Sequence, residues 1–231
     1  NYNFMEMSYK HIDKWLEISD VFPENVNRQN NWDQIICKIN QQKLFTLTHD
    51  QYHLARLQSI LLKNAGAWLK VIPSENIGTR LNNDEVRISI CLRLGLPIFE
   101  RHLCKCGLVV DEFGRHCFSC NMNNGRFIRH QLLNDTIHRT LVNAGIPNRT
   151  EASNLLRADN LRPDGVSIIP FIKGKPLVWD VTSPHSLIET NLNNFYPGKA
   201  AEQAENKKIL KYHVLEENYH FSPIAIETMG E

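Results

Sequence analysis

The sequence from Arg162 to Thr182 is RPDGVSIIPFIKGKPLVWDVT. Two β-like runs flank the segment PFIKGK, and we expect them to form a hairpin with a loose loop over residues 170–175. Such a hairpin would bring Asp164 and Asp180 together on neighbouring strands. Because side chains alternate along a strand, Asp180 and Thr182 should lie on the same face. Paired carboxylates supply the hard oxygen ligands that magnesium prefers, although aspartate is also common at turns and strand ends.

A helix is expected after the hairpin, over about residues 199–215. It would place Glu205, Lys208 and Tyr212 on one face, because they are spaced at i, i+3 and i+7. A lysine directed at paired carboxylates could orient or deprotonate a water and stabilise charge that develops on a phosphate. The alternative is a solvated helix with ordinary ion pairs. Elsewhere the periodicity predicts helices over residues 84–94 and 126–144 and a last strand over residues 221–227.

Cysteine and histidine concentrate upstream of the hairpin, where four of the six cysteines lie between residues 104 and 120. Zinc prefers four soft or borderline ligands, and short chelating pairs at the two ends of a loop supply them with little loss of entropy. A disulfide and free thiols are the alternatives, but no signal peptide opens the chain, which favours zinc. The site would be structural, with no open position for a substrate. We expect its ligands to be Cys104, Cys106, His116 and Cys120, with Cys117 and His102 as substitutes.

An ordered set of motifs extends over roughly residues 60–231. It comprises Cys-x-Cys-Gly, Gly-x-His-x3-Cys, Arg129-His130-x3-Asn134-Asp135, Arg162-Pro163-Asp164-Gly165, Trp179-Asp180-Val181-Thr182, a Glu-x2-Lys-x3-Tyr helix and Glu227-Thr228-Met229-Gly230. This order resembles the carboxy-terminal region of reverse-transcriptase polyproteins from non-LTR-type retroelements, the retrotransposons of that class. In those proteins a zinc knuckle precedes a restriction-like endonuclease of the PD-(D/E)XK superfamily.

The resemblance implies a hydrolase, a magnesium- or manganese-dependent endodeoxyribonuclease that nicks target DNA to prime reverse transcription. It assigns Asp164 to the aspartate of the Pro-Asp motif and Asp180 to the second metal carboxylate. An acid from the first core helix often completes the metal site in this superfamily. Asp135 and Glu151 are the candidates for that acid in this sequence.

The superfamily's lysine, two residues after the second acid, is replaced by Thr182. In several branches that lysine comes from the next helix, so the resemblance makes Lys208 the candidate, with Lys207 and Lys211 as neighbours and Glu205 on the same face. Thr182 also keeps a second function open. In that alternative the chain is a nuclease-fold module that has lost activity and binds DNA or RNA.

The candidates for contact with nucleic acid are Arg126, Arg129, His130 and Arg162. Between residues 121 and 175 the sequence has eight basic and four acidic residues, so a local basic excess surrounds the acidic site although the net charge of the whole chain is only +1. His130, Asn134 and His138 share a helical face. We expect that face to turn toward nucleic acid or toward the hairpin; a metal-binding histidine pair is the alternative.

The composition of the 231-residue chain, 42% apolar and 22% charged, excludes disordered and collagen-like classes and allows a buried core. We expect an α/β (α+β) architecture with a mixed sheet flanked by helices. A helical linker would occupy residues 1–100, the zinc knuckle residues 101–121 and the restriction-like endonuclease domain residues 122–231. The core should include Trp179, Phe171 and Phe127.

No apolar run approaches the roughly 20 residues needed to cross a bilayer, so a membrane is not expected as a partner. The chain begins at Asn1 rather than Met, and we expect it to be part of a longer polyprotein that contains a reverse transcriptase. The resemblance implies target DNA as the partner, element RNA as a second candidate, and a nuclear location.

Overall fold

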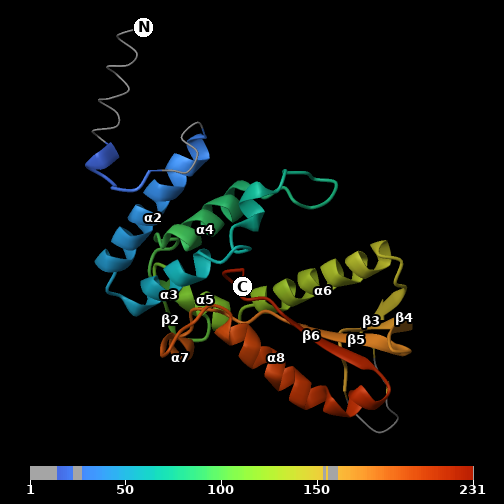
Figure 1. The fold of residues 1–231 in the computed structure, drawn as a ribbon. Helices are drawn as coiled ribbons and strands as arrows, with labels where there is room; N and C mark the ends of the chain where they lie inside the picture. The colour runs from blue at the N-terminus through green and yellow to red at the C-terminus, as the bar shows by residue number, and fades with distance from the viewer. Residues whose placement is uncertain (1–14, 23–27, 153–154, 156–160, 231) are drawn as a thin grey trace. The chain divides into compact units, whose positions relative to one another are not determined.

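The computed structural model describes residues 15–22, 28–152, 155 and 161–230, which fall into two compact units, residues 1–50 and 51–231 (Figure 1). The first unit contains α2 (Gln29–Leu47). The indole of Trp15 packs edge-on against Trp32 there, with ring centroids 4.6 Å apart. The division falls between residues 50 and 51, whereas the sequence suggested a helical segment that ends at residue 100.

Residues 51–100 belong to the second unit because their helices pack against distant parts of the chain. They form α3 (Gln51–Ile60), the 3-10 helix η1 (Ala67–Lys70) and α4 (Asn83–Leu94). Tyr52 and Ala55 of α3 form a buried cluster with Leu187. The helix predicted over residues 84–94 is confirmed as α4, which begins at a capping box of Asn82 and Glu85 and ends at a left-handed glycine, Gly95.

A four-stranded mixed sheet forms the centre of the second unit. Its strands are β3 (Asn148–Thr150), β4 (Gly165–Ile172), β5 (Lys175–Thr182) and β6 (His220–Ala225), in the order β3-β4-β5-β6. The first two pairings are antiparallel, and β5 and β6 are parallel. Parallel neighbours need a crossover, which here runs through α7 (Glu189–Leu192), α8 (Lys199–Tyr212) and the 3-10 helix η2 (His213–Glu217). The structure is therefore mixed α/β, as the sequence predicted.

The hairpin of β4 and β5 is tighter than the sequence suggested. Ile172 pairs with Lys175, so the expected loose loop is replaced by a two-residue turn at Lys173 and Gly174. Both turn residues have positive φ, 50° and 77°, which matches the twist of the flanking strands. The strands consequently include residues at both ends of the segment 170–175, which the sequence analysis assigned to the loop.

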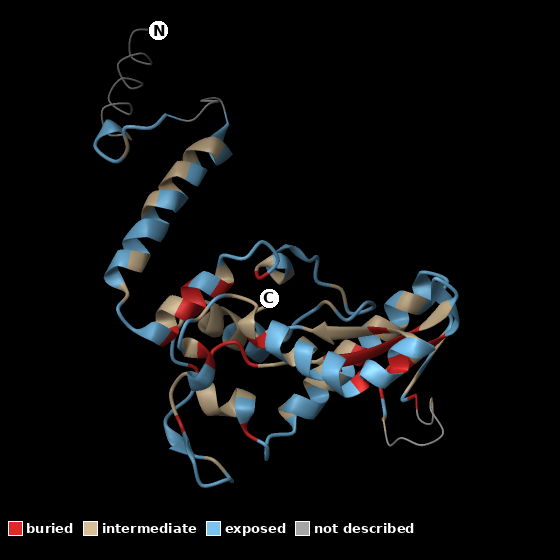
Figure 2. Cartoon of the chain, turned by 60° about the horizontal axis from the view of Figure 1, so that its bottom comes forward, coloured by how far each residue is buried: buried red, intermediate tan, exposed pale blue. Residues whose placement is uncertain are grey.

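Two helices cover opposite faces of the sheet. From α6 (Gly125–Asn143), Leu133, Ile137 and Leu141 pack against the face of β5 that carries Leu177, Trp179 and Val181. On the other face, Val178 packs with Tyr212 of α8, Leu215 of η2 and Phe221 of β6. Figure 2 shows the resulting burial of β5, whose residues Leu177–Val181 are all buried. Apart from Asp180, the buried residues of the strand are apolar on both sides, because both of its faces are covered.

Gly165 and Trp179 pair across the hairpin, and the indole of Trp179 occupies the space that a side chain at residue 165 would need. A Cβ atom on Gly165 would lie 2.0 Å from Cζ2 of Trp179, so only glycine fits beneath the indole. Trp179 is fully buried, as predicted. Phe171 and Phe127 are 43% and 64% exposed, so their predicted places in the core are wrong. The fit of Gly165 under Trp179 holds the neighbouring residues Asp164 and Asp180 at the same end of the sheet.

In the described parts of the chain, no helix has both the length and the apolar character that crossing a membrane demands.

Candidate functional site

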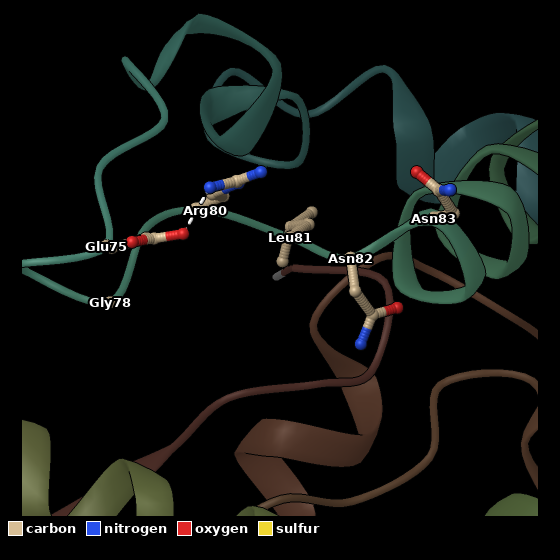
Figure 3. Close-up of a pocket in the computed structure, with 6 residues that line it drawn as sticks. All are labelled: Glu75, Gly78, Arg80, Leu81, Asn82 and Asn83. Atoms are coloured by element: carbon tan, nitrogen blue, oxygen red, sulfur yellow. Dashed lines mark hydrogen bonds and ion pairs between the residues drawn. The ribbon is translucent and has the colours of Figure 1, made fainter.

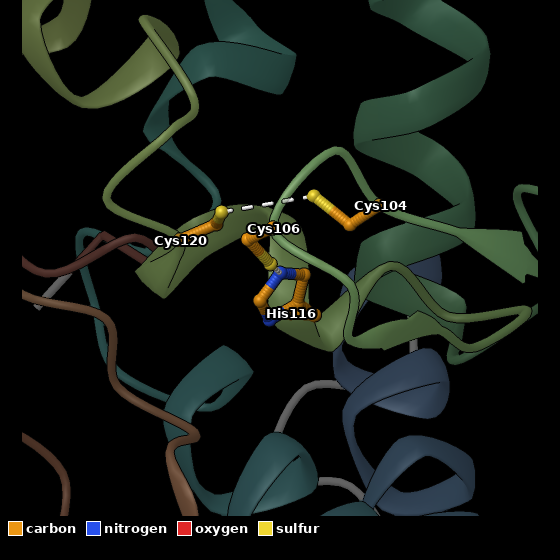
Figure 4. Close-up of side chains that lie close together, drawn as sticks. All are labelled: Cys104, Cys106, His116 and Cys120. Carbon is orange, nitrogen blue, oxygen red and sulfur yellow. Dashed lines mark hydrogen bonds between the residues drawn. The ribbon is translucent and has the colours of Figure 1, made fainter.

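Four predicted zinc ligands converge at one end of α6. Cys104 and Cys106 lie between the short strands β1 (His102–Leu103) and β2 (Val109–Val110), and His116 and Cys120 come from α5 (Arg115–Ser119) and its C-cap. The Sγ of Cys106 lies 3.0 Å from Nε2 of His116, and the Sγ atoms of Cys104 and Cys120 are 3.7 Å apart (Figure 4). All four ligand atoms lie within 4.8 Å of one another.

This arrangement fits a tetrahedral zinc ion. Two thiolates bound to zinc at about 2.3 Å are separated by about 3.8 Å, close to the distance between Cys104 and Cys120. A hydrogen bond from the backbone of Cys106 lowers the pKa of the Cys104 thiol to about 6, which favours the thiolate that binds metal. The left-handed Gly107, with φ 86°, closes the turn after Cys106. Cys104, Cys106, His116 and Cys120, the four residues named from the sequence, thus form one cluster that could hold a metal ion.

The two substitute ligands lie outside this cluster. Desolvation raises the pKa of the Cys117 thiol, and this cysteine is not among the grouped ligand atoms. His102 interacts through Nδ1 with the carbonyl of Glu100 at 2.7 Å. The four originally assigned residues therefore need no replacement.

A second group of ligand atoms forms where α6, β4, β5 and α8 meet. His130, Asp164 and Asp180 offer ligand atoms within 4.8 Å of one another. The Oδ2 atom of Asp164 lies 3.0 Å from Nε2 of His130 and accepts a hydrogen bond from the backbone N–H of Val181 at 2.6 Å. The ammonium of Lys208 donates to Oδ1 of Asp180. The hairpin thus brings the predicted aspartates together, and α8 supplies the predicted lysine.

The residues of this second group fit a six-coordinate divalent cation. Adjacent ligands of a six-coordinate magnesium ion, with bonds of 2.0–2.1 Å at right angles, are about 3.0 Å apart. The separation of 3.0 Å between His130 Nε2 and Asp164 Oδ2 equals that value. The side chain of Asp180 is only 4% exposed, and a carboxylate so deeply buried requires a compensating cation. Lys208 provides one such charge, and a metal ion would provide another.

Tyr212 fixes the position of α8 relative to the hairpin. Its hydroxyl donates to the carbonyl of Arg162 at 3.1 Å and accepts from Lys211 at 3.0 Å. Burial, together with the nearby carboxylate of Asp180, raises the pKa of Tyr212 well above its ordinary value, so the hydroxyl stays protonated. Lys211 is engaged with Tyr212, and Lys207 is exposed. Lys208 is therefore the lysine of the three that reaches Asp180.

Several sequence candidates lie outside the group of ligand atoms around Asp164. Asp135 and Glu151 are exposed, and neither belongs to it. Glu205 is half-buried one turn before Lys208, and Thr182 ends β5. The histidine of α6 takes the place in which the sequence led us to expect an acid.

The sequence named His130 as a contact for nucleic acid, and the structure places it beside Asp164 instead of an acid. The available signal was the helical face that His130 shares with Asn134. The side-chain amide of Asn134 accepts from the indole of Trp179 at 2.8 Å and donates to the carbonyl of Asp164 at 3.3 Å. The prediction that this face turns toward the hairpin is therefore confirmed, and it directs His130 at Asp164.

The three arginine candidates have different surroundings. Arg126 and Arg162 are exposed, and Arg126 donates to the Asn121 side chain at 2.5 Å. Arg129 is half-buried, donates to the carbonyl of Phe118 at 3.3 Å and lies over its ring. Desolvation lowers the pKa of Arg129. Arg129 therefore joins α6 to Phe118 of α5, whereas Arg126 and Arg162 offer their charge to solvent.

A hollow of about 540 Å³ lies before α4, lined by Glu75, Gly78, Arg80, Leu81, Asn82 and Asn83 (Figure 3). Its polar groups have partners, because Arg80 pairs with Glu75 and the side chain of Asn82 caps α4. None of these lining residues belongs to either group of metal-ligand atoms found in the described residues.

Comparison with protein-family models gives no match for this chain, and no curated protein matches it. The resemblance to retroelement proteins therefore stays a prediction that rests on the ordered motifs.

Proposed function

We propose that the chain is a metal-dependent DNA endonuclease that nicks its target by phosphodiester hydrolysis, with a restriction-like core over residues 122–231. The observation that carries this proposal is the convergence of Asp164, which directly precedes β4, with Asp180 of β5 and Lys208 of α8. Two acids and a lysine in one place are the groups that metal-dependent phosphodiester hydrolysis needs. The mixed sheet flanked by α6 and α8 also supports it.

Each residue of the site has a distinct task in this proposal. Asp164 and Asp180 would hold magnesium or manganese, which polarises the phosphate and lowers the pKa of a bound water. The backbone N–H of Val181 orients the carboxylate of Asp164. Lys208 orients the attacking water and neutralises negative charge that develops on the phosphate. Tyr212 keeps α8, and with it Lys208, in place against the hairpin.

The zinc knuckle has a structural task. The guanidinium of Arg129, from α6, lies over the ring of Phe118 in α5. The Phe118 ring also stacks on the imidazole of His185, with the ring centroids 4.6 Å apart. The knuckle therefore packs against the helix that carries His130. The exposed Arg126 and Arg162 would contact phosphates of the nucleic acid.

The context predicted by the resemblance belongs to the same proposal. The nick would prime reverse transcription by a polymerase of the same polyprotein, in the nucleus, with element RNA as a further partner.

The second candidate function is a nuclease-fold module that binds DNA or RNA without cleaving it. The observation in its favour is Thr182, which ends β5 where the superfamily motif has lysine. Lys208 would then be a structural partner of the buried Asp180.

A nicking assay on supercoiled plasmid with magnesium or manganese separates the two functions. We expect the wild type to convert plasmid to the open circle and both Asp164→Ala and Asp180→Ala to lose the activity. Asp135→Ala is the matched control, because Asp135 is an exposed acid of α6 outside the site. Equal nicking by all four proteins rejects the assignment. A wild type that retards DNA on a gel without nicking it supports the binding module.

A further inference from the structure

His130 approaches the two aspartates from a rigidly placed helix. The side chain is 36% exposed, and that of Asp164 is 16% exposed, so the pair lies at the border between the sheet and solvent. One turn later, Asn134 is buried and bonded to both Trp179 and the backbone of Asp164. These bonds fix the rotation of α6. The imidazole is therefore directed at the carboxylate by the fold rather than by a flexible loop.

We propose that His130 is a direct ligand of the catalytic metal, so that the centre consists of one histidine and two aspartates. This inference rests on the metal site of the proposed function. Nε2 of His130 and Oδ2 of Asp164 lie 3.0 Å apart, within hydrogen-bonding distance. His130 and Asp164 would hold the metal ion through these two atoms, with the Nε2 proton released to solvent.

The neighbouring histidine on the same helical face does not share this role. His138 lies two turns further along α6, where its Nδ1 interacts with the side chain of Asn148 at 2.6 Å. It is absent from the ligand group around Asp164. The histidine pair considered from the sequence is thus divided, with His130 at the metal and His138 holding β3 against α6.

A nitrogen ligand changes which metal the centre prefers. A third carboxylate would give the three ligands a total charge of −3, whereas an imidazole in its place leaves −2. The nearby ammonium of Lys208 reduces the net negative charge around the metal ion further. Magnesium is a hard ion that favours oxygen, while manganese accepts imidazole nitrogen more readily. The histidine centre should therefore bind manganese more tightly than magnesium.

Pulsed electron paramagnetic resonance of bound Mn²⁺ tests this directly, because spin-echo modulation detects a coordinated ¹⁴N nucleus. The full chain is first loaded with zinc, so that the cysteine site is filled. We expect the wild type and His138→Gln to show modulation from imidazole nitrogen. His130→Gln, which keeps a polar group near Asp164 but removes the nitrogen ligand, should lose it and bind Mn²⁺ at least about tenfold more weakly.

A second variant tests the metal preference by replacing the nitrogen ligand with an oxygen ligand. His130→Glu restores a carboxylate, and we expect the ratio of Mn²⁺ to Mg²⁺ affinity in titration calorimetry to fall below that of the wild type. Retained ¹⁴N modulation in His130→Gln, or an unchanged affinity ratio in His130→Glu, overturns the inference.

The same measurements distinguish a failure of the histidine ligand from a failure of the nuclease assignment. Mn²⁺ binding that depends on Asp164 but shows no ¹⁴N coupling in the wild type rejects the histidine ligand and leaves the proposed function intact. Coupling from His130 in a protein that does not nick DNA supports the ligand and rejects the nuclease. A wild type that binds no Mn²⁺ rejects both.

Discussion

The ammonium of Lys208 donates a hydrogen bond to Oδ1 of Asp180, across 28 residues of sequence and from a helix onto the central strand. The carboxylate is 4% exposed and the lysine side chain 26%. A buried pair of this kind contributes little net stability, but removing one partner leaves an uncompensated charge in the interior. Substituting either partner alone should therefore lower the free energy of unfolding more than substituting both.

Lys208→Met should destabilise the zinc-loaded, magnesium-free protein by about 3 kcal/mol, because Asp180 loses its charge partner. Adding Asp180→Asn should recover most of that loss, since no buried charge remains. Urea unfolding of the two single variants and the double variant measures the coupling. The control is Lys207→Met on the exposed side of α8, expected to change stability by less than about 0.5 kcal/mol. Equal effects of the two lysine substitutions contradict the coupling.

The zinc site is tested by two cysteines of the same segment. Cys120→Ser removes a ligand and should reduce bound zinc from about one equivalent to well below half, together with a loss of folded structure in the knuckle. Cys117→Ser changes a thiol outside the ligand group and should leave the zinc content unchanged. Elemental analysis after gel filtration gives the stoichiometry. If both variants lose zinc, or neither does, the ligand set is wrong.

The arginines should separate into binding and structural residues. Arg126→Ala and Arg162→Ala should each weaken DNA binding and reduce the slope of log affinity against log salt by about 1, without a change in thermal stability. Arg129→Ala should instead destabilise the fold by about 1–3 kcal/mol, because the carbonyl of Phe118 loses its donor. Fluorescence anisotropy at several salt concentrations and thermal unfolding provide the two measurements. A salt slope that changes only in Arg129→Ala would reverse the assignment.

His185 should make the protein sensitive to mild acid. The residue is buried, and its Nδ1 bonds to Thr228 at 2.6 Å. Desolvation, with a smaller effect from Arg129, lowers its pKa to about 4. The unfolded chain, with a histidine pKa of about 6.5, binds the proton first, so stability should fall between about pH 6.5 and pH 4, by at most about 3 kcal/mol.

The matching variant is His185→Phe, which retains an aromatic ring against Phe118 but cannot titrate. As the pH falls across the same interval, the wild type should lose more unfolding free energy than the variant, so the difference between them shifts in favour of the variant. Zinc release in acid affects both proteins and cancels in that difference. A difference that is constant from pH 7 to pH 4 would show that His185 is not buried in its neutral form.

Local patterns in the sequence were sufficient for several elements and for the cluster of Cys104, Cys106, His116 and Cys120. Helix α4 follows from its capping box and its terminal glycine, and both signals are contained within a few residues. The cysteine cluster is equally local, because its ligands are separated by short loops. The alternation of the hairpin was enough to pair Asp164 with Asp180. Each of these inferences depends on neighbours in the chain.

The tertiary structure decided which faces are covered and what reaches the acidic site. The sequence did not predict that β6 pairs parallel to β5, that Phe171 and Phe127 are exposed, or that Arg129 is held by the knuckle. It also placed an acid where His130 lies. These outcomes depend on how α6 and α8 rotate against the sheet. That rotation is set by buried contacts such as the one between Asn134 and Trp179, 45 residues apart, which no local periodicity encodes.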